Sequence, residues 1–214
     1  GWSLTEEVSV GGLSGDVEYE FGLISGVDVD AAGNLYIADV QAQEVRVFDP
    51  SGVYVRTIGK AGSGPGEIGA GGLAGVFVLG DEVFVPDMAN ARINRFTLEG
   101  EALEAVALEL VKGGIPIRWD RVAQDVIAQR RTVNTNAATA DDFEPTGDVV
   151  VTMNRETPEV LATLPVGHSL QITAGAPPVI KIFDAEPIWD AGDDGSLLLA
   201  MNGSVRIEVW SPDG

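Results

Sequence analysis

Apolar and polar positions alternate in short blocks along residues 26–59, and turn-forming residues separate these blocks. The interruptions include Gly33-Asn34 and Pro50-Ser51-Gly52, while the blocks between them are rich in β-branched and aromatic residues. This pattern predicts consecutive antiparallel strands joined by tight turns. We expect four strands, at residues 26–30, 35–39, 44–49 and 53–58.

The same pattern recurs twice further along the chain. A shift of 48 positions brings Asp39 onto Asp87 without a gap, and a shift of 162 positions brings Gly33 onto Gly195. A repeat of roughly 40–50 residues with four strands in each copy indicates the blades of a β-propeller. The fold class predicted is therefore all-β, a propeller of four-stranded antiparallel blades.

The second strands of the repeats are apolar on both faces. Residues 35–38, 83–85 and 197–200 are continuous apolar runs rather than alternating ones. A strand of this kind is expected where both faces of its sheet are covered. In a propeller, each sheet is covered by the blades on its two sides, which explains the pattern.

We expect one domain with about four blades, at residues 21–59, 71–108, 115–165 and 187–214. Residues 4–10 are predicted to be an outer closing strand, because they align with the end of a fourth strand. The last blade lacks a fourth strand before the sequence stops. The chain is therefore expected to be an incomplete ring.

Composition adds constraints on partners rather than on the fold. The formal net charge is −20 with a pI near 4.1, and the chain contains no Cys. Such an acidic surface repels phosphate backbones, so nucleic acid is not an expected partner. No apolar run approaches the roughly 20 residues of a transmembrane helix.

Three stretches carry a resemblance to known proteins. GNLYIAD at residues 33–39 and DMANARI at residues 87–93 resemble the NHL repeat, and the glycine-rich link at residues 59–68 is similar to that of bacterial six-bladed β-propeller proteins. The resemblance implies six blades, of which about four are present here. It also implies an exported protein, periplasmic or extracellular and often lipid-anchored, mostly without an assigned activity. The repeat positions interpreted as structural are Gly33, Asp39, Asp87, Asn90, Arg92 and Gly195.

The sequence offers no catalytic group that we assign. His168 is the single histidine, so a histidine-rich metal site is excluded. Asp28, Asp30 and Asp39 have some of the spacing of a calcium loop, but a strand followed by a Gly-Asn hairpin explains them better. No cofactor is predicted, and calcium is the minor alternative. Asp39 and Asp87 are expected to accept N–H groups of the turns that follow them.

The expected function is a ligand- or protein-binding scaffold. The long excursions, at residues 131–147 and 166–187, share one face with the links between blades, because successive strands alternate in direction. Long loops on a rigid scaffold commonly carry function. The alternative is a calcium-dependent lactonase-like or strictosidine-synthase-like hydrolase, an activity known for related propellers. The candidate ligand-binding residues are Arg130, Arg131, Asn134, Asn136, Asp141, Asp142 and His168.

Overall fold

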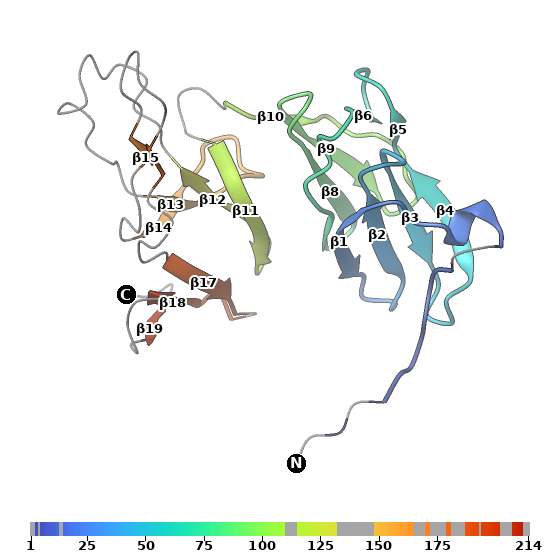
Figure 1. Cartoon of the computed structure of the whole chain (residues 1–214), viewed down its shortest axis with the longest axis horizontal. Coiled ribbons are helices and arrows are strands. Elements are labelled where there is room, and N and C mark those ends of the chain that lie inside the picture. The colour runs from blue at the N-terminus through green and yellow to red at the C-terminus, as the bar shows by residue number, and fades with distance from the viewer. Residues whose placement is uncertain are drawn as a thin grey trace. The chain divides into compact units, whose positions relative to one another are not determined.

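In the computed structural model, the regular secondary structure of the described residues is almost all antiparallel sheet (Figure 1). The chain divides into two compact units, Gly1–Leu108 and Glu109–Gly214, and each is a separate body below. A 3₁₀ helix of three residues, η1 (Val17–Tyr19), is the only helix in the described part. The described residues are 3, 5–12, 15–109, 115–131, 148–164, 170–171, 179–180, 187–192, 194–201 and 207–211.

The first unit contains two four-stranded meanders, as the repeat predicts. One has the order β1-β2-β3-β4 and the other β10-β9-β8-β7, with every pairing antiparallel. A short parallel pair, β5 (Lys60–Ala61) and β6 (Glu67–Ile68), lies in the link between them. The strands are β1 (Ile24–Val29), β2 (Leu35–Asp39), β3 (Glu44–Phe48), β4 (Tyr54–Ile58), β7 (Phe77–Leu79), β8 (Glu82–Asp87), β9 (Arg92–Thr97) and β10 (Val106–Ala107).

The second unit contains a four-stranded and a three-stranded sheet. Their orders are β11-β12-β13-β14 and β17-β18-β19, again antiparallel, and β15 pairs with β16 in a separate two-stranded sheet. Residues 165–169, 172–178 and 181–186 lie outside the described part. The strands are β11 (Ile115–Val122), β12 (Asp125–Arg131), β13 (Val149–Thr152), β14 (Val160–Thr163), β15 (Leu170–Gln171), β16 (Val179–Ile180), β17 (Pro187–Ala191), β18 (Leu197–Met201) and β19 (Ile207–Trp210).

The hydrophobic core of each unit lies between its two main sheets. In the first unit, Tyr36 and Val47 of one sheet belong to the same buried cluster as Val83 and Phe96 of the other. In the second, Ile127 and Val150 share a cluster with the Trp189 side chain of the next sheet. Sheet-on-sheet burial of this kind explains the continuous apolar runs in the second strands, at residues 35–38 and 83–85.

The far side of the first sheet is covered by the segment that precedes β1. The rings of Tyr19 and Phe21 lie 5.4 and 6.0 Å from the ring of Phe48, measured between centroids. Phe48 is fully buried as a result. The segment therefore takes the place that a neighbouring blade has on the other face.

Of the predicted outer strand at residues 4–10, the structure describes residues 5–10. Residues 5–10 have no strand conformation in the structure. Val8 and Val10 instead lie beside the β3–β4 turn, where a Cβ added at Gly52 would stand 2.9 Å from a methyl group of Val8. Both main sheets of this unit have four strands without this segment, so the closing strand of a further blade stays a prediction.

Side chains of β9 and of the turn before it hold the glycine-rich link in place. The Arg92 guanidinium donates to the carbonyls of Gly64 and Glu67 at 2.6 and 2.7 Å, and Asn90 donates to that of Gly62. The Glu67 carboxylate accepts the Gly64 N–H at 2.7 Å. The link is thus a folded crossover rather than a phosphate-binding loop.

Gly66 should tolerate a side chain much less well than Gly80. Both have positive φ, 70° and 58°. A Cβ at Gly66 would lie 2.8 Å from the Ala102 Cβ, whereas nothing lies within 4 Å at Gly80. Gly80→Ala should cost about 1–2 kcal/mol of unfolding free energy from backbone strain alone. Gly66→Ala should cost roughly 1–3 kcal/mol more because of overpacking. Urea unfolding of the two variants measures the difference, and equal costs would contradict this account of the link.

Candidate functional site

In each unit, the candidate residues lie at the end of a sheet that carries the turn between its second and third strands. In the first sheet, Asp39 closes β2, and its carboxylate accepts the N–H of Gln41 at 3.0 Å and that of Ala42 at 3.3 Å in the following turn. It also accepts the N–H groups of Gly22 and Leu23, at 2.9 and 3.2 Å. Burial raises the pKa of Asp39, but these four N–H donors outweigh it and hold the pKa below its usual value.

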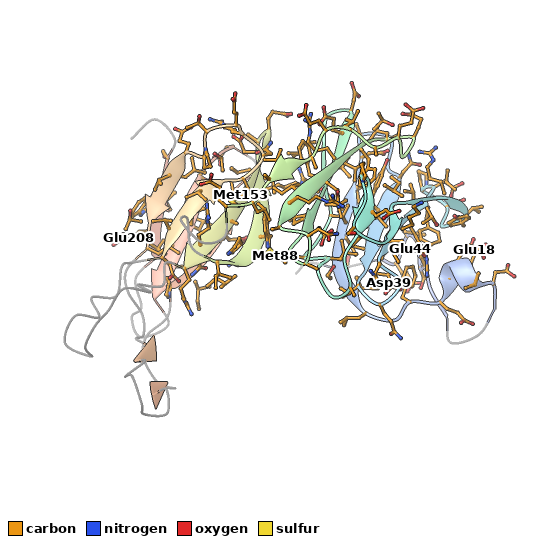
Figure 2. All side chains as sticks on the ribbon, turned by 90° about the horizontal axis from the view of Figure 1, so that it is seen from above. Glu18, Asp39, Glu44, Met88, Met153 and Glu208 are labelled. Atoms are coloured by element: carbon orange, nitrogen blue, oxygen red, sulfur yellow. The ribbon has the colours of Figure 1, made fainter. Side chains whose placement is uncertain are left out.

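The neighbouring cation, Arg46 on β3, is also fully engaged. Its guanidinium donates to Glu44 at 2.8 Å and to the carbonyls of Glu18 and Glu20, and it lies 3.9 Å from Asp39. Figure 2 shows Asp39 and Glu44 near one another at this end of the unit, as expected for cross-strand partners. All of these groups are used to fasten residues 18–23 to the sheet, so we assign them a structural role.

The second sheet repeats this arrangement around Asp87. Its carboxylate accepts the N–H of Gly69 at 3.0 Å and that of Asn90 at 3.2 Å, together with the Asn90 side-chain amide at 2.7 Å. The glycines of the repeat, Gly33 and Gly195, have φ values of 85° and 87° in hairpin turns. These residues shape turns and links and leave little free chemistry.

The third sheet has a different set of residues at this end. Arg131 closes β12 and donates to the Asp148 carboxylate at 2.9 Å, and Gln129 donates to the same carboxylate at 2.7 Å. The Trp189 indole N–H, from the next sheet, donates to the Gln129 side-chain oxygen at 2.7 Å. A chain of hydrogen bonds thus runs from the core to Arg131, whose side chain remains 34% exposed.

Arg130 points to the other side of the same strand. The residue is buried, and its guanidinium donates to the Glu109 carbonyl at 2.6 Å. Burial lowers the pKa of Arg130, and the Glu109 charge partly compensates. Its position favours a role in fastening the start of this unit over contact with a ligand.

Only two of the seven predicted ligand-binding residues fall in the described part of the chain. Arg130 and Arg131 lie at the predicted end of the third sheet, on opposite faces of β12. The other five, Asn134, Asn136, Asp141, Asp142 and His168, lie outside the described residues. Sequence reasoning missed Gln129, Asp148 and Trp189. A signal existed for two of them: Gln129 interrupts an apolar strand, and Asp148 comes directly after the polar insert.

A further charged group lies on the first strands of the two sheets in the second unit. The Arg118 guanidinium stands 4.3 Å from the Trp189 ring centroid and donates to the Trp189 carbonyl. It also lies 3.6 and 3.5 Å from the carboxylates of Asp120 and Asp190. The described residues contain no group of three or more His, Cys, Asp or Glu side chains placed to hold a metal ion.

The residues considered for a calcium loop form a hairpin turn. The Asp30 carboxylate accepts the N–H groups of Ala32 and Asn34, both at 2.9 Å, and the Tyr36 hydroxyl at 3.2 Å. Burial and the Asp30 charge raise the pKa of Tyr36 to about 12. Asp28 instead accepts the Val78 N–H at 2.7 Å, which ties β1 to β7.

The sheets and their packing define a β-propeller protein, and the comparisons agree. Residues 7–112 match the model of a family described as a 6-bladed beta-propeller. The match does not specify the NHL type of repeat. No curated protein matches the sequence. Within the described residues, no helix is long and apolar enough to cross a membrane.

Solved structures of similar fold include a Bacteroides fragilis protein that is predicted to be exported. The two share 16% sequence identity with a TM-score of 0.58, and the match covers 94% of this chain and 53% of that one. Virginiamycin B lyase from Staphylococcus aureus is 14% identical with a TM-score of 0.46, covering 89% of this chain and 67% of the lyase. This chain therefore spans about half the length of the first protein and two thirds of the second.

The stability contributed by Asp39 should depend on pH. Because the folded-state pKa lies below the unfolded one, the contribution is present above the unfolded pKa and is lost as pH falls through the folded pKa. Asp39→Asn should therefore cost about 1–3 kcal/mol at neutral pH, where it leaves buried N–H groups poorly paired. The cost should shrink as the pH falls below the usual range of an Asp carboxyl and through the lowered folded-state pKa of Asp39, where the wild type loses its charge as well.

Urea unfolding across this pH range measures the effect. Asp16→Asn is the control, since it removes the same charge at an exposed position whose carboxylate makes no cap bond to η1. A cost for Asp39→Asn that stays constant from neutral to acid pH would contradict the role assigned to its carboxylate.

Proposed function

We propose that this chain is part of a binding scaffold, which holds a small-molecule or protein ligand at the blade ends bearing the inter-blade links and the long inserts. The observation that carries the proposal is the Arg131–Asp148 ion pair. The chain leaves the third sheet at Arg131 and re-enters it at Asp148, so this pair lies at the base of the sixteen-residue insert 132–147.

The base of the insert is held by a network of hydrogen bonds, which supports a binding role. Asp148 is buried and shared between Arg131 and Gln129, and Gln129 is in turn held by Trp189. Arg130 and Val149 are direct cross-strand partners immediately below. A loop with fixed ends loses less conformational entropy when it closes on a ligand than one on a mobile base.

The corresponding ends of the first two sheets are occupied differently. Asp39, Arg46, Asp87 and Arg92 are committed to backbone groups of their own links. The partly exposed guanidinium of Arg131, together with the polar insert beside it, is thus the better candidate for ligand contact. We further propose an extracytoplasmic location, on the strength of the resemblance to exported propellers.

Unbiased mapping of bound ligands tests the proposal. The chain is titrated with a library of small molecules and short peptides while backbone amide NMR shifts are followed. Hits should perturb the amides of Arg131 and Asp148. Deleting residues 134–141 should abolish binding of those hits while changing the thermal midpoint by no more than about 2 °C, since the deletion removes none of the sheet residues that the structure describes.

A matched pair of variants removes one positive charge from each end of the same sheet. Arg131→Gln should weaken the hits, whereas Arg121→Gln, at the opposite end of the same sheet, should leave them unchanged. Hits that bind equally well after the 134–141 deletion would exclude the insert from the site and refute the proposal in this form.

A further inference from the structure

The second unit has a cavity at the opposite end of its sheets. It has a volume of about 400 Å³ and is formed by turns and strand ends of both sheets. From the third sheet come the β11–β12 turn and the segment between β13 and β14, and from the last sheet come the β17–β18 turn and the end of β19. Its lining residues are Val122, Ala123, Asp125, Arg155, Glu159, Val160, Leu161, Asp194, Gly195, Leu197, Trp210 and Ser211.

In the first unit, a hydrogen bond joins the two main sheets at the corresponding end, where the turns between first and second strands lie. There, Arg56 of β4 donates a hydrogen bond to the Leu98 carbonyl in the β9–β10 connection. In the second unit, the cavity occupies the corresponding place between the two sheets. Such a cavity is therefore a property of these particular residues rather than of every pair of blades.

One wall of the cavity is apolar and continuous with the core. Val122 and Leu197 are buried members of the core cluster, and Leu161 and Trp210 pack against that cluster. Leu197 and Trp210 are cross-strand partners, which fixes the indole at the edge of the wall. This surface suits the aliphatic part of a long side chain.

The rim of the cavity is acidic. Arg155 is engaged twice, by Asp125 at 2.6 Å and by Glu159 at 2.6 Å, so its charge is already matched. Asp194 accepts the Ser196 N–H at 3.0 Å, and no cation among the described residues pairs with it. Three carboxylates and one guanidinium leave an excess of negative charge around an apolar wall.

We propose that this cavity binds the side chain of an arginine from an extended peptide. The guanidinium would pair with Asp194 and contact the Trp210 ring, while the aliphatic stem lies on the apolar wall. Aromatic rings attract guanidinium groups, and arginine combines an apolar stem with a charged head. The charge excess supplies the complementarity. This site is separate from the insert at the other end of the same sheets.

Two peptides that differ only in charge test the proposal on the wild-type chain. Acetyl-Ala-Arg-Ala-amide should produce saturable shifts of the Trp210 indole N–H resonance. The citrulline peptide of the same shape lacks the charge and should bind about three- to fivefold more weakly, as expected for a partly exposed ion pair. Added salt should weaken the arginine peptide and leave the citrulline peptide unchanged.

Two variants then locate the charge that matters. Asp194→Asn keeps an oxygen for the Ser196 N–H but removes the charge, and it should abolish the advantage of arginine over citrulline. Asp190→Asn, on β17 of the same sheet but outside the cavity lining, should leave that advantage intact. Equal binding of the two peptides to the wild type would overturn the proposal. The proposal would also be overturned if the two variants lost the advantage of arginine over citrulline equally, or if peptide binding left the Trp210 indole N–H resonance unchanged.

Discussion

The structure depends on covering both faces of each four-stranded sheet. The side chains that β2 and β3 present to the next sheet, such as Tyr36, Val45 and Val47, are fully buried. One isolated sheet would leave these strands wet on both faces, at a cost of roughly 1.5–3 kcal/mol for each large side chain exposed. The turns, links and covering segment of the first unit all serve to keep the two faces covered.

The structure also depends on hydrogen bonds to the polar groups that are buried at the blade ends. Removing a carboxylate from water is costly unless hydrogen bonds replace the solvent. Asp39, Asp87 and Asp148 meet this condition with N–H donors distant in sequence. Asp39 and Asp87 thereby fasten the segments at Gly22 and Gly69 to their sheets, whereas Asp148 binds Gln129 of the adjacent strand β12. Among the described residues, Arg92 Nε and Asn94 Oδ1 are the buried side-chain atoms left without a partner, both on β9 beside the glycine-rich link.

The two ends of the second unit differ in chemistry, which matters for function. One end has an Arg131–Asp148 pair at the base of a polar insert, and the other has an acidic cavity with a tryptophan at its edge. The sheets between them are held by one core cluster. A scaffold of this kind allows the ends to vary while the packing that supports them is retained.

The sequence by itself determined the strands, the turns and the propeller class, because a strand and its turn depend on residues close together in the chain. The strand expected at residues 35–39 matches β2. The sequence also predicted that Asp39 accepts N–H groups of the turn that follows it. Residues 5–10 have no strand conformation, and their alignment with a fourth strand could not show whether a neighbouring strand is there to pair with them. Tertiary structure alone joined Gln129 to Asp148, 19 residues away, and to Trp189, 60 residues away. It also assembled the cavity from separate turns, since contacts between sheets depend on how the sheets pack.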